Sequence, residues 1–289
     1  MILVTGATGH FGTIVIDSLL QHGVPANQIA AFVRDPQKAA QITNKDIVIR
    51  QGDYNNYDSM LDAFEGVEKL LLISGTDIVN RERQQTDAVK AALEAGVQHI
   101  YYTSFARRNE TESSPLGIVA KAHIGTENQI ISTGLKYTIM RNTLYADGIP
   151  AFVGERVFET GIYFPAGDGK CAFATRGDMA YAASLLLMQE GHENKIYDFC
   201  NTENVTFYDI ADVLSTISGR EIAYVSQEME EFKETMRAAG IPEGALDGIL
   251  PFAEAIREGE FEADRSDLET ILGRRPMSVR EYLIGVYGQ

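Results

Sequence analysis

The sequence predicts an α/β fold, a doubly wound parallel sheet followed by a smaller, mostly helical C-terminal region. Two observations support this prediction. Short apolar segments alternate with helix-like segments through the first half of the chain, as in parallel sheets that helices cover on both faces. After about residue 142 the alternation ends, and a stretch rich in glycine and aromatic residues runs to Gly169. We therefore expect the sheet mainly in residues 1–142, joined again by about 177–200, and the smaller region in residues 143–289.

The strands of the first half are predicted from short apolar runs. These runs are Ile2–Val4, Ile29–Val33, Ile47–Arg50, Leu70–Ile73, Ile100–Thr103 and Tyr137–Arg141. Helices are predicted between them, over 11–22, roughly 58–65, 80–95 and 116–133. Turn signals such as Asp35-Pro36 separate the segments, so the chain can reverse direction between each strand and helix.

The second half is predicted to be mostly helical. Its expected elements are a helix near 177–189, a strand at Ile196–Cys200, a capped helix at Thr206–Ser218 and a strand at 221–225. From residue 228 the chain is helical and acidic, and we expect a solvated face at Glu228, Glu230, Glu231 and Glu234. The polar segment Arg107–Pro115 has no periodicity, which predicts a surface loop that could close over a site.

Composition narrows the classes of protein to consider. The 289 residues are 45% hydrophobic and carry a formal net charge of −16, which disfavours binding to nucleic acid. No apolar run has the length of a membrane span. We expect no signal peptide, because a basic leader is missing and Gly6 interrupts the first apolar stretch. The two cysteines, Cys171 and Cys200, are expected to be reduced thiols of a cytoplasmic protein.

The start of the chain predicts a dinucleotide-binding site. Gly6, Gly9 and Gly12 lie between the first strand and the first helix. The amino end of a helix attracts anions, and glycine lets a pyrophosphate approach the backbone. The residues expected to contact this group are Gly6, Thr8, Gly9, His10, Phe11 and Gly12. The alternative is a tight turn between strand and helix that binds no ligand.

The same segment, Thr5–Gly12, resembles the start of the atypical short-chain dehydrogenase/reductases, and the whole chain resembles their NmrA-like group. Within that group it is similar to type 2 quinone oxidoreductases and triphenylmethane reductases. Further matching segments are Val33–Asp35, Gly52–Tyr54, Leu72–Gly75, His99–Thr103, Tyr137–Asn142 and Gly273–Ser278. The resemblance implies a Rossmann-type, NAD(P)-binding domain over residues 1–142, a substrate pocket in the C-terminal region and an NAD(P)H-dependent activity. Homodimers are common among such folds, but the sequence does not fix the oligomeric state.

Arg34 at the end of the second strand predicts a preference for NADPH, with NADH as the alternative. Sites that prefer NAD commonly place a carboxylate here, to accept the ribose hydroxyls. The arginine fork suits a phosphate instead, and Lys38 could add a second positive charge. Asp35 argues the other way, because it could accept a ribose hydroxyl. A solvated turn made by Arg34 and Asp35 is a further alternative.

The other expected cofactor-binding residues follow the carboxyl ends of later strands, where ligands of open parallel sheets bind. They are Asp53, Tyr54, Ser74, Gly75, Thr103, Ser104, His123 and Asn142. The resemblance places Asp53 near the adenine amino group, although it could instead cap the next helix. Asn142 is expected to meet the nicotinamide carboxamide or the substrate.

The Tyr-x-x-x-Lys pair of typical short-chain dehydrogenases is absent from its expected position. Val119 stands at the tyrosine position and His123 at the lysine position. His123 and Glu127, four residues apart, share a helix face. These two residues are the catalytic candidates. His123 is expected to hold a ribose hydroxyl or to relay a proton. A purely structural His123 is the alternative. No third ligand is spaced for a metal site.

Loss of the tyrosine acid favours acceptors that need no strong acid. Reduction of a quinone yields a hydroquinone anion whose conjugate acid has a phenol-like pKa of about 10, so direct hydride transfer to a quinone or a similar delocalised acceptor is expected. The acceptor pocket is expected to use Ile78, Phe105, Tyr145 and Phe152, each of which could also be ordinary core. The other candidates are a non-catalytic cofactor sensor that binds a partner protein and, less favoured, a nucleotide-sugar epimerase.

Overall fold

The computed structural model describes residues 1–39, 42, 45–111 and 113–288. The chain forms two compact units. The first comprises Met1–Phe105, Ile118–Asn142 and Arg176–Asp198, and the second comprises Ala106–Gly117, Thr143–Thr175 and Phe199–Gln289. The segment Arg176–Asp198 thus belongs to the first unit, although the preceding residues, Thr143–Thr175, belong to the second.

A seven-stranded sheet forms the centre of the first unit, in the order β3-β2-β1-β4-β5-β6-β8. Its strands are β1 (Ile2–Val4), β2 (Ile29–Val33), β3 (Val48–Gln51), β4 (Lys69–Leu72), β5 (His99–Phe105), β6 (Lys136–Asn142) and β8 (Lys195–Phe199). From β3 to β6 in this order, each strand pairs in parallel with the next. The order 3-2-1-4-5-6 is that of a Rossmann-type, doubly wound sheet, so the predicted fold class is confirmed.

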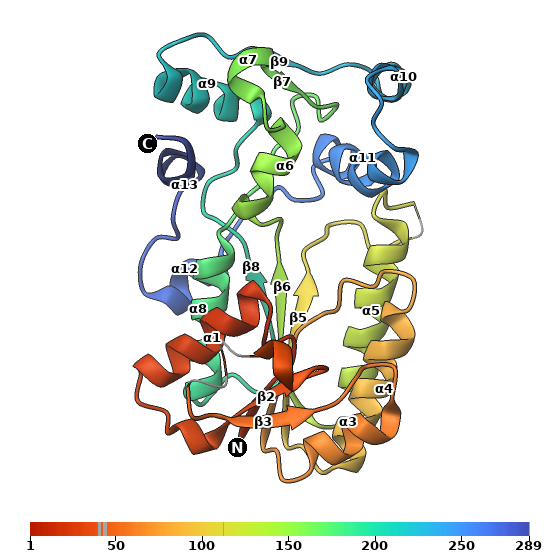
Figure 1. Cartoon of the computed structure of the whole chain (residues 1–289), viewed down its shortest axis with the longest axis vertical. Helices are drawn as coiled ribbons and strands as arrows, with labels where there is room; N and C mark the ends of the chain where they lie inside the picture. The colour runs from red at the N-terminus through yellow and green to blue at the C-terminus, as the bar shows by residue number, and fades with distance from the viewer. Residues whose placement is uncertain (40–41, 43–44, 112, 289) are drawn as a thin grey trace. The chain divides into compact units, whose positions relative to one another are not determined.

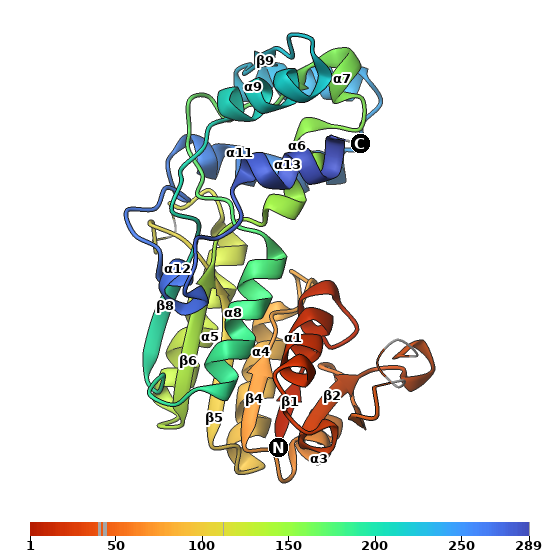
Figure 2. The same ribbon diagram turned by 90° about the vertical axis from the view of Figure 1, so that its left-hand side faces the viewer.

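Helices cover both faces of this sheet. They are α1 (His10–Gln21), α3 (Tyr57–Phe64), α4 (Arg81–Glu94), α5 (Gly117–Ser132) and α8 (Arg176–Met188), with short 3-10 turns η1 (Ala26–Gln28) and η2 (Pro36–Ala39). Figure 1 shows α1 and α8 on one face and α3, α4 and α5 on the other. Figure 2 shows α1 and α8 side by side. The predicted strands and helices of the first half all occur, and no end is shifted by more than two residues.

The central strands are apolar because both of their faces are buried. All five residues of β2 are buried, and Leu3 of β1 lies between Ala30 of β2 and Leu70 of β4. A strand covered on both sides has no solvent face, which explains its uninterrupted apolar run. On the α3–α5 side the core includes Phe64 and Tyr102, both fully buried.

The second unit is smaller and mostly helical. Its elements are η3 (Ala146–Gly148), α6 (Ile149–Val153), α7 (Val157–Thr160), β7 (Ile162–Tyr163), α9 (Phe207–Ser218), β9 (Tyr224–Val225), α10 (Met229–Ala238), α11 (Glu243–Arg257), α12 (Asp267–Leu272) and α13 (Val279–Tyr287). A capping box of Thr206 and Asp209 begins α9, which confirms the predicted cap. The acidic side chains around α10 are exposed, as expected.

The segment 107–115 is only partly the surface loop that its polarity predicts. The side chain of Arg107 is 1% exposed, and Ser114 is buried. The backbone N–H groups of Arg108 and Asn109 both donate to Oε2 of Glu260, at 2.9 and 2.8 Å. The buried carboxylate of Glu260 accepts both hydrogen bonds and so holds the segment against the rest of the second unit.

Two further expectations can be compared with the structure. Cys171 and Cys200 are buried thiols that are not joined in a disulfide bond. Among the described residues, every helix falls short of the length and apolar character that a bilayer crossing needs.

Candidate functional site

The turn between β1 and α1 requires glycine at two positions. Gly6 has a φ of +57°, which favours glycine. A Cβ on Gly12 would lie 2.5 Å from the carbonyl oxygen of Gly6, so only glycine lets α1 start this close to the turn. Gly9 is the N-cap of α1, without a side-chain cap or an acidic residue in the first turn. The first N–H groups of α1 are therefore suited to an anionic ligand.

A cavity of about 370 Å³ opens beside this turn, at the carboxyl ends of β1, β2, β3 and β4. The sequence-predicted residues that line it are Gly6, Thr8, Gly9, Arg34, Asp53, Tyr54, Ser74 and Gly75. They come from separate loops, and the strand order brings them together. The lining also contains residues that the sequence did not single out, namely Phe32, Val33, Asn55, Ile73, Thr76, Asp77 and Gln84.

Arg34 directly follows β2 and is exposed to solvent. It is one of the residues that line this cavity, to which it brings a positive charge. The neighbouring Asp35 accepts the N–H of Gln37 at 3.0 Å and so supports the turn into η2. Lys38 belongs to η2, but its side chain lies outside the described part of the structure. Among the described residues that line the cavity, Arg34 is therefore the one with a positive charge.

Asp53 does not cap the helix that follows it. The N-cap of α3 is Asn56, whose side chain accepts from Ser59, while Asp53 accepts from the backbone N–H of Asn55 at 2.8 Å. The helix-cap alternative for Asp53 is therefore wrong. Tyr54 donates to the carbonyl of Ile73 at 3.1 Å, and burial raises its pKa above the usual range for a phenol.

The loop after β4 is held by hydroxyl groups of neighbouring strands. Thr5 accepts the N–H of Ile73 at 2.8 Å, and Thr103 accepts the N–H of Ser74 at 2.9 Å. Thr103 thus supports the cavity wall from the end of β5. These bonds hold the backbone of Ile73 and Ser74 at the wall of the cavity.

The remaining predicted cofactor residues lie outside the lining of this cavity. His10 begins α1 and lies 3.2 Å from the guanidinium of Arg176. Phe11 is buried on α1. Asn142 ends β6, where it pairs in register with Phe105 of β5.

His123 belongs to a buried chain of hydrogen bonds that starts at the cavity wall. Nε of Arg81 donates to the carbonyl of Gly75 at 2.8 Å, and Nη1 of Arg81 lies 3.5 Å from Nε2 of His123. Nδ1 of His123 lies 2.7 Å from the hydroxyl of Tyr102, and this hydroxyl donates to Oε1 of Gln85 at 2.8 Å. The chain continues from Nε2 of Gln85 to Thr126, at 3.2 Å.

The donors of this chain can be assigned. Thr126 gives its hydroxyl hydrogen to the carbonyl of Ala122, so it accepts from the amide of Gln85. Tyr102 gives its single hydrogen to Gln85, so Nδ1 of His123 carries the hydrogen between His123 and Tyr102. Nε2 then accepts from Arg81, because a guanidinium can only donate. The geometry describes a neutral His123 beside a cation.

Glu127 takes part in a second buried cluster. Its carboxylate accepts from Nε and Nη2 of Arg141, at 3.2 and 2.7 Å, and from the hydroxyl of Ser104. This pair joins α5 to the ends of β5 and β6. The sequence analysis did not single out four residues of these two clusters, Arg81, Gln85, Tyr102 and Arg141. Two glutamines on the alanine-rich face of α4 were a usable signal of a buried polar contact.

The expected acceptor residues fall into both units. In the first unit Ile78 is exposed, and the ring of Phe105 stacks on His123 with centroids 5.8 Å apart. In the second unit Tyr145 pairs with Ala174. Phe152 contacts Phe164 and Phe207 in an aromatic cluster, with centroids 5.1 and 6.3 Å away. Within the described part of the chain, no group of three histidine, cysteine or acidic side chains is placed to hold a metal ion.

Comparison with known proteins gives consistent matches over the whole chain. The model of the NmrA-like family matches residues 1–283. Quinone oxidoreductase 2 of Escherichia coli (strain K12) is 36% identical over 282 residues, which are 97% of this chain and 96% of that protein.

Solved structures agree with the sequence comparison. The NADPH-dependent quinone oxidoreductase of Escherichia coli, complexed with NADPH, has a TM-score of 0.92 and 34% identity, covering 99% of this chain and 100% of that one. The triphenylmethane reductase of Citrobacter sp. has a TM-score of 0.90 and 37% identity, covering 100% of this chain and 99% of that one.

Proposed function

This chain belongs to the NmrA-like family, and we propose that it is a reductase that uses NADPH to deliver hydride to a quinone or a similar delocalised acceptor. The observation that carries the proposal is the glycine turn beside a cavity that Arg34 borders. Relatives at 34–37% identity, described as NADPH-dependent quinone oxidoreductase and triphenylmethane reductase, support the same reaction class.

We propose that the first unit holds the cofactor through its own backbone. The free N–H groups at the start of α1 would bind the diphosphate, and the Arg34 guanidinium would bind the ribose phosphate that distinguishes NADPH. Asp53 and Tyr54 border the cavity farther along, and we assign them to the adenosine end. When bound, NADPH supplies the hydride.

The proposed reaction needs no dedicated acid. Val119 occupies the position of the usual tyrosine and has no proton to give. The conjugate acid of a hydroquinone anion has a pKa of about 10, so the anion is a weak enough base to form without a proton from the protein. The protein's part is then to hold the acceptor and exclude water. Within the first unit we assign Phe105 and Ile78 to acceptor contacts, and Asn142 to the carboxamide or the acceptor, while the roles of Tyr145 and Phe152 stay predictions.

His123 and Glu127 fit the proposal as positioning residues. Nε2 of His123 accepts from Arg81, which in turn holds the carbonyl of Gly75 at the cavity wall. Glu127 fixes Ser104 and Arg141 at the strand ends. Their support keeps the loop and the strand ends in place while the cofactor is bound. The homodimer and the cytoplasmic location stay predictions.

The experiment is a kinetic one with the purified full chain. NADPH absorbance is followed with a panel of quinones and with a cationic triphenylmethane dye, and cofactor binding is measured separately by calorimetry. We expect saturable turnover with at least one acceptor. Tight binding of NADPH without turnover of any acceptor would contradict the reductase and favour the sensor, because the absence of the tyrosine is compatible with both.

A further inference from the structure

A second cavity lies at the opposite edge of the same sheet. Its volume is about 160 Å³, enough for on the order of five water molecules. Lys69, His99 and Lys136, which line it, are the first residues of β4, β5 and β6. The glycine turn and Arg34 follow the carboxyl ends of their strands instead. The cavity is therefore separate from the proposed cofactor site, within one compact unit.

A tyrosine hydroxyl points into this cavity without a partner. Tyr101 is 1% exposed and lines the cavity, and its ring stacks on His99 with centroids 4.0 Å apart. Its hydroxyl has no hydrogen bond to any residue that the structure describes. Burial and the carboxylates of Glu193 and Glu68 raise the pKa of Tyr101 above its usual range, so the hydroxyl keeps its proton. The hydroxyl reaches the solvent of the cavity, so a ligand that displaces this water can form a hydrogen bond to it.

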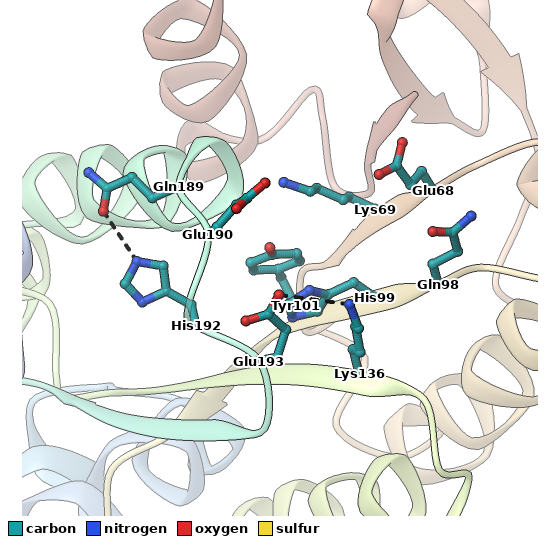
Figure 3. A pocket seen from close by; sticks show the side chains of 10 residues that line it. All are labelled: Glu68, Lys69, Gln98, His99, Tyr101, Lys136, Gln189, Glu190, His192 and Glu193. Carbon is teal, nitrogen blue, oxygen red and sulfur yellow. Dashed lines mark hydrogen bonds and ion pairs between the residues drawn. The ribbon is translucent and has the colours of Figure 1, made fainter.

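Charges of both signs surround this hydroxyl. Figure 3 shows Lys69 and Glu190 extending toward one another from opposite sides, with Tyr101 near the centre of the group. Below them, Lys136 and Glu193 form an ion pair at 3.8 Å. Lys69 is fixed by the carbonyl of Leu187 at 2.6 Å.

The two histidines of the lining add no charge near neutral pH. Burial lowers the pKa of His99 to about 4 and also lowers the pKa of His192. Instead they hold the wall in place. His99 bonds Thr138 at 2.8 Å, and Thr138 donates to the carbonyl of His192 at 2.8 Å. His192 bonds Tyr197 at 2.7 Å, so the loop that carries Glu190 and Glu193 is preorganised.

We propose that this cavity binds a small zwitterion, a molecule with one ammonium and one carboxylate group such as a short amino acid. A simple anion would face Glu68, Glu190 and Glu193, and a simple cation would face Lys69 and Lys136. A zwitterion satisfies both signs, with its carboxylate toward Lys69 and the Tyr101 hydroxyl and its ammonium toward Glu190. The proposal does not depend on the reductase activity.

Calorimetric titration of the full chain tests this assignment. Glycine, β-alanine and 4-aminobutyrate serve as zwitterions of increasing charge separation, and acetate and methylammonium serve as probes with a single charge. We expect one zwitterion to give a saturable isotherm that both single-charge probes fail to give. Tyr101→Phe and Glu190→Gln should each weaken that binding about tenfold, the loss of one hydrogen bond or charge contact.

Matched variants separate this site from folding defects and from the cofactor site. Tyr208→Phe and Glu203→Gln change exposed residues of the second unit and should leave zwitterion affinity unchanged. Glu190 is exposed, so its variant keeps the fold even if Tyr101→Phe does not. NADPH affinity should be the same in all four variants. Absence of any saturable isotherm, equal binding of acetate, or unchanged zwitterion affinity in Glu190→Gln would overturn the proposal, whatever the outcome for NADPH.

Discussion

The hydroxyl of Tyr102 lies 2.7 Å from Nδ1 of His123 and donates its own hydrogen to Gln85. This relationship decides which ring nitrogen of His123 carries the hydrogen. The hydrogen must lie on Nδ1, and Nε2 presents a lone pair to Arg81. The positive charge beside the cavity wall is thus carried by Arg81, while His123 is neutral.

Nitrogen NMR of labelled protein should show His123 as the Nδ1–H tautomer near neutral pH. Tyr102→Phe removes the acceptor for this hydrogen, so we expect a mixture of tautomers and a loss of stability of about 1–2 kcal/mol. Tyr57→Phe, which changes an exposed hydrogen bond to Glu94, is the control. An Nε2–H signal in the unaltered protein would contradict the assigned chain of donors.

Arg34→Ala should weaken NADPH binding about 10- to 100-fold and NADH binding far less. The reason is that the guanidinium has a charge-assisted partner only in the cofactor that carries the additional phosphate. Calorimetry with both cofactors measures the two affinities. Arg156→Ala, at an exposed residue of the second unit that pairs with Glu159, is the control. Equal losses for the two cofactors would remove the assigned role of Arg34.

Gly12→Ala should lower stability by about 1–3 kcal/mol and reduce NADPH affinity, because the new Cβ would meet the carbonyl oxygen of Gly6 at 2.5 Å. Gly125→Ala in α5 is the matched control, since a Cβ there meets no atom within 4 Å. It should be neutral or stabilising, by about 0.5–1 kcal/mol. Thermal unfolding and NADPH titration check both. A Gly12 variant with unaltered Tm and affinity would show that the turn can relax.

Glu127→Gln should destabilise the protein by about 2–4 kcal/mol, because it leaves the Arg141 guanidinium beside a neutral amide in a buried setting. Glu127 is 4% exposed by its side chain. Glu159→Gln breaks the exposed pair with Arg156 and should cost about 0.5 kcal/mol or less. Urea unfolding of the two variants gives the comparison. Similar losses in both would indicate that burial does not strengthen the Glu127 pair.

His99 should make stability depend on pH between about 4 and 6.5. Its pKa falls from 6.5 to about 4 on folding because of burial. The unfolded chain therefore binds more protons in this interval, and the free energy of unfolding decreases as the pH is lowered. From pH 7 to about pH 4.5 this residue should account for about 2 kcal/mol.

The measurement is urea unfolding at several pH values in parallel with His99→Gln, which keeps a side chain able to bond Thr138. Other groups titrate in both proteins, so the difference between the two curves isolates His99. Curves that stay parallel through this interval would show that the pKa of His99 is not lowered in the folded state.

Prediction from the sequence succeeded where the physical constraint is local. Buried runs such as Ile29–Val33 have one compatible place, inside a sheet covered on both faces. Gly6 and Gly12 are required by a turn only a few residues long. Asp53 was harder, because the choice between a cap and a ligand contact depends on Asn56, which caps the helix instead.

The amino-acid sequence by itself determined the doubly wound fold and the glycine turn, because periodicity and backbone sterics act over short stretches of chain. Only the tertiary structure decided that Tyr102, Gln85 and Arg81 surround His123, and that Tyr101 faces a charged cavity at the far edge of the sheet. Hydrogen-bond partners depend on strand order and on the rotation of each helix. These bring together residues that lie far apart in the chain and whose own sequence neighbourhoods give no sign of the contact.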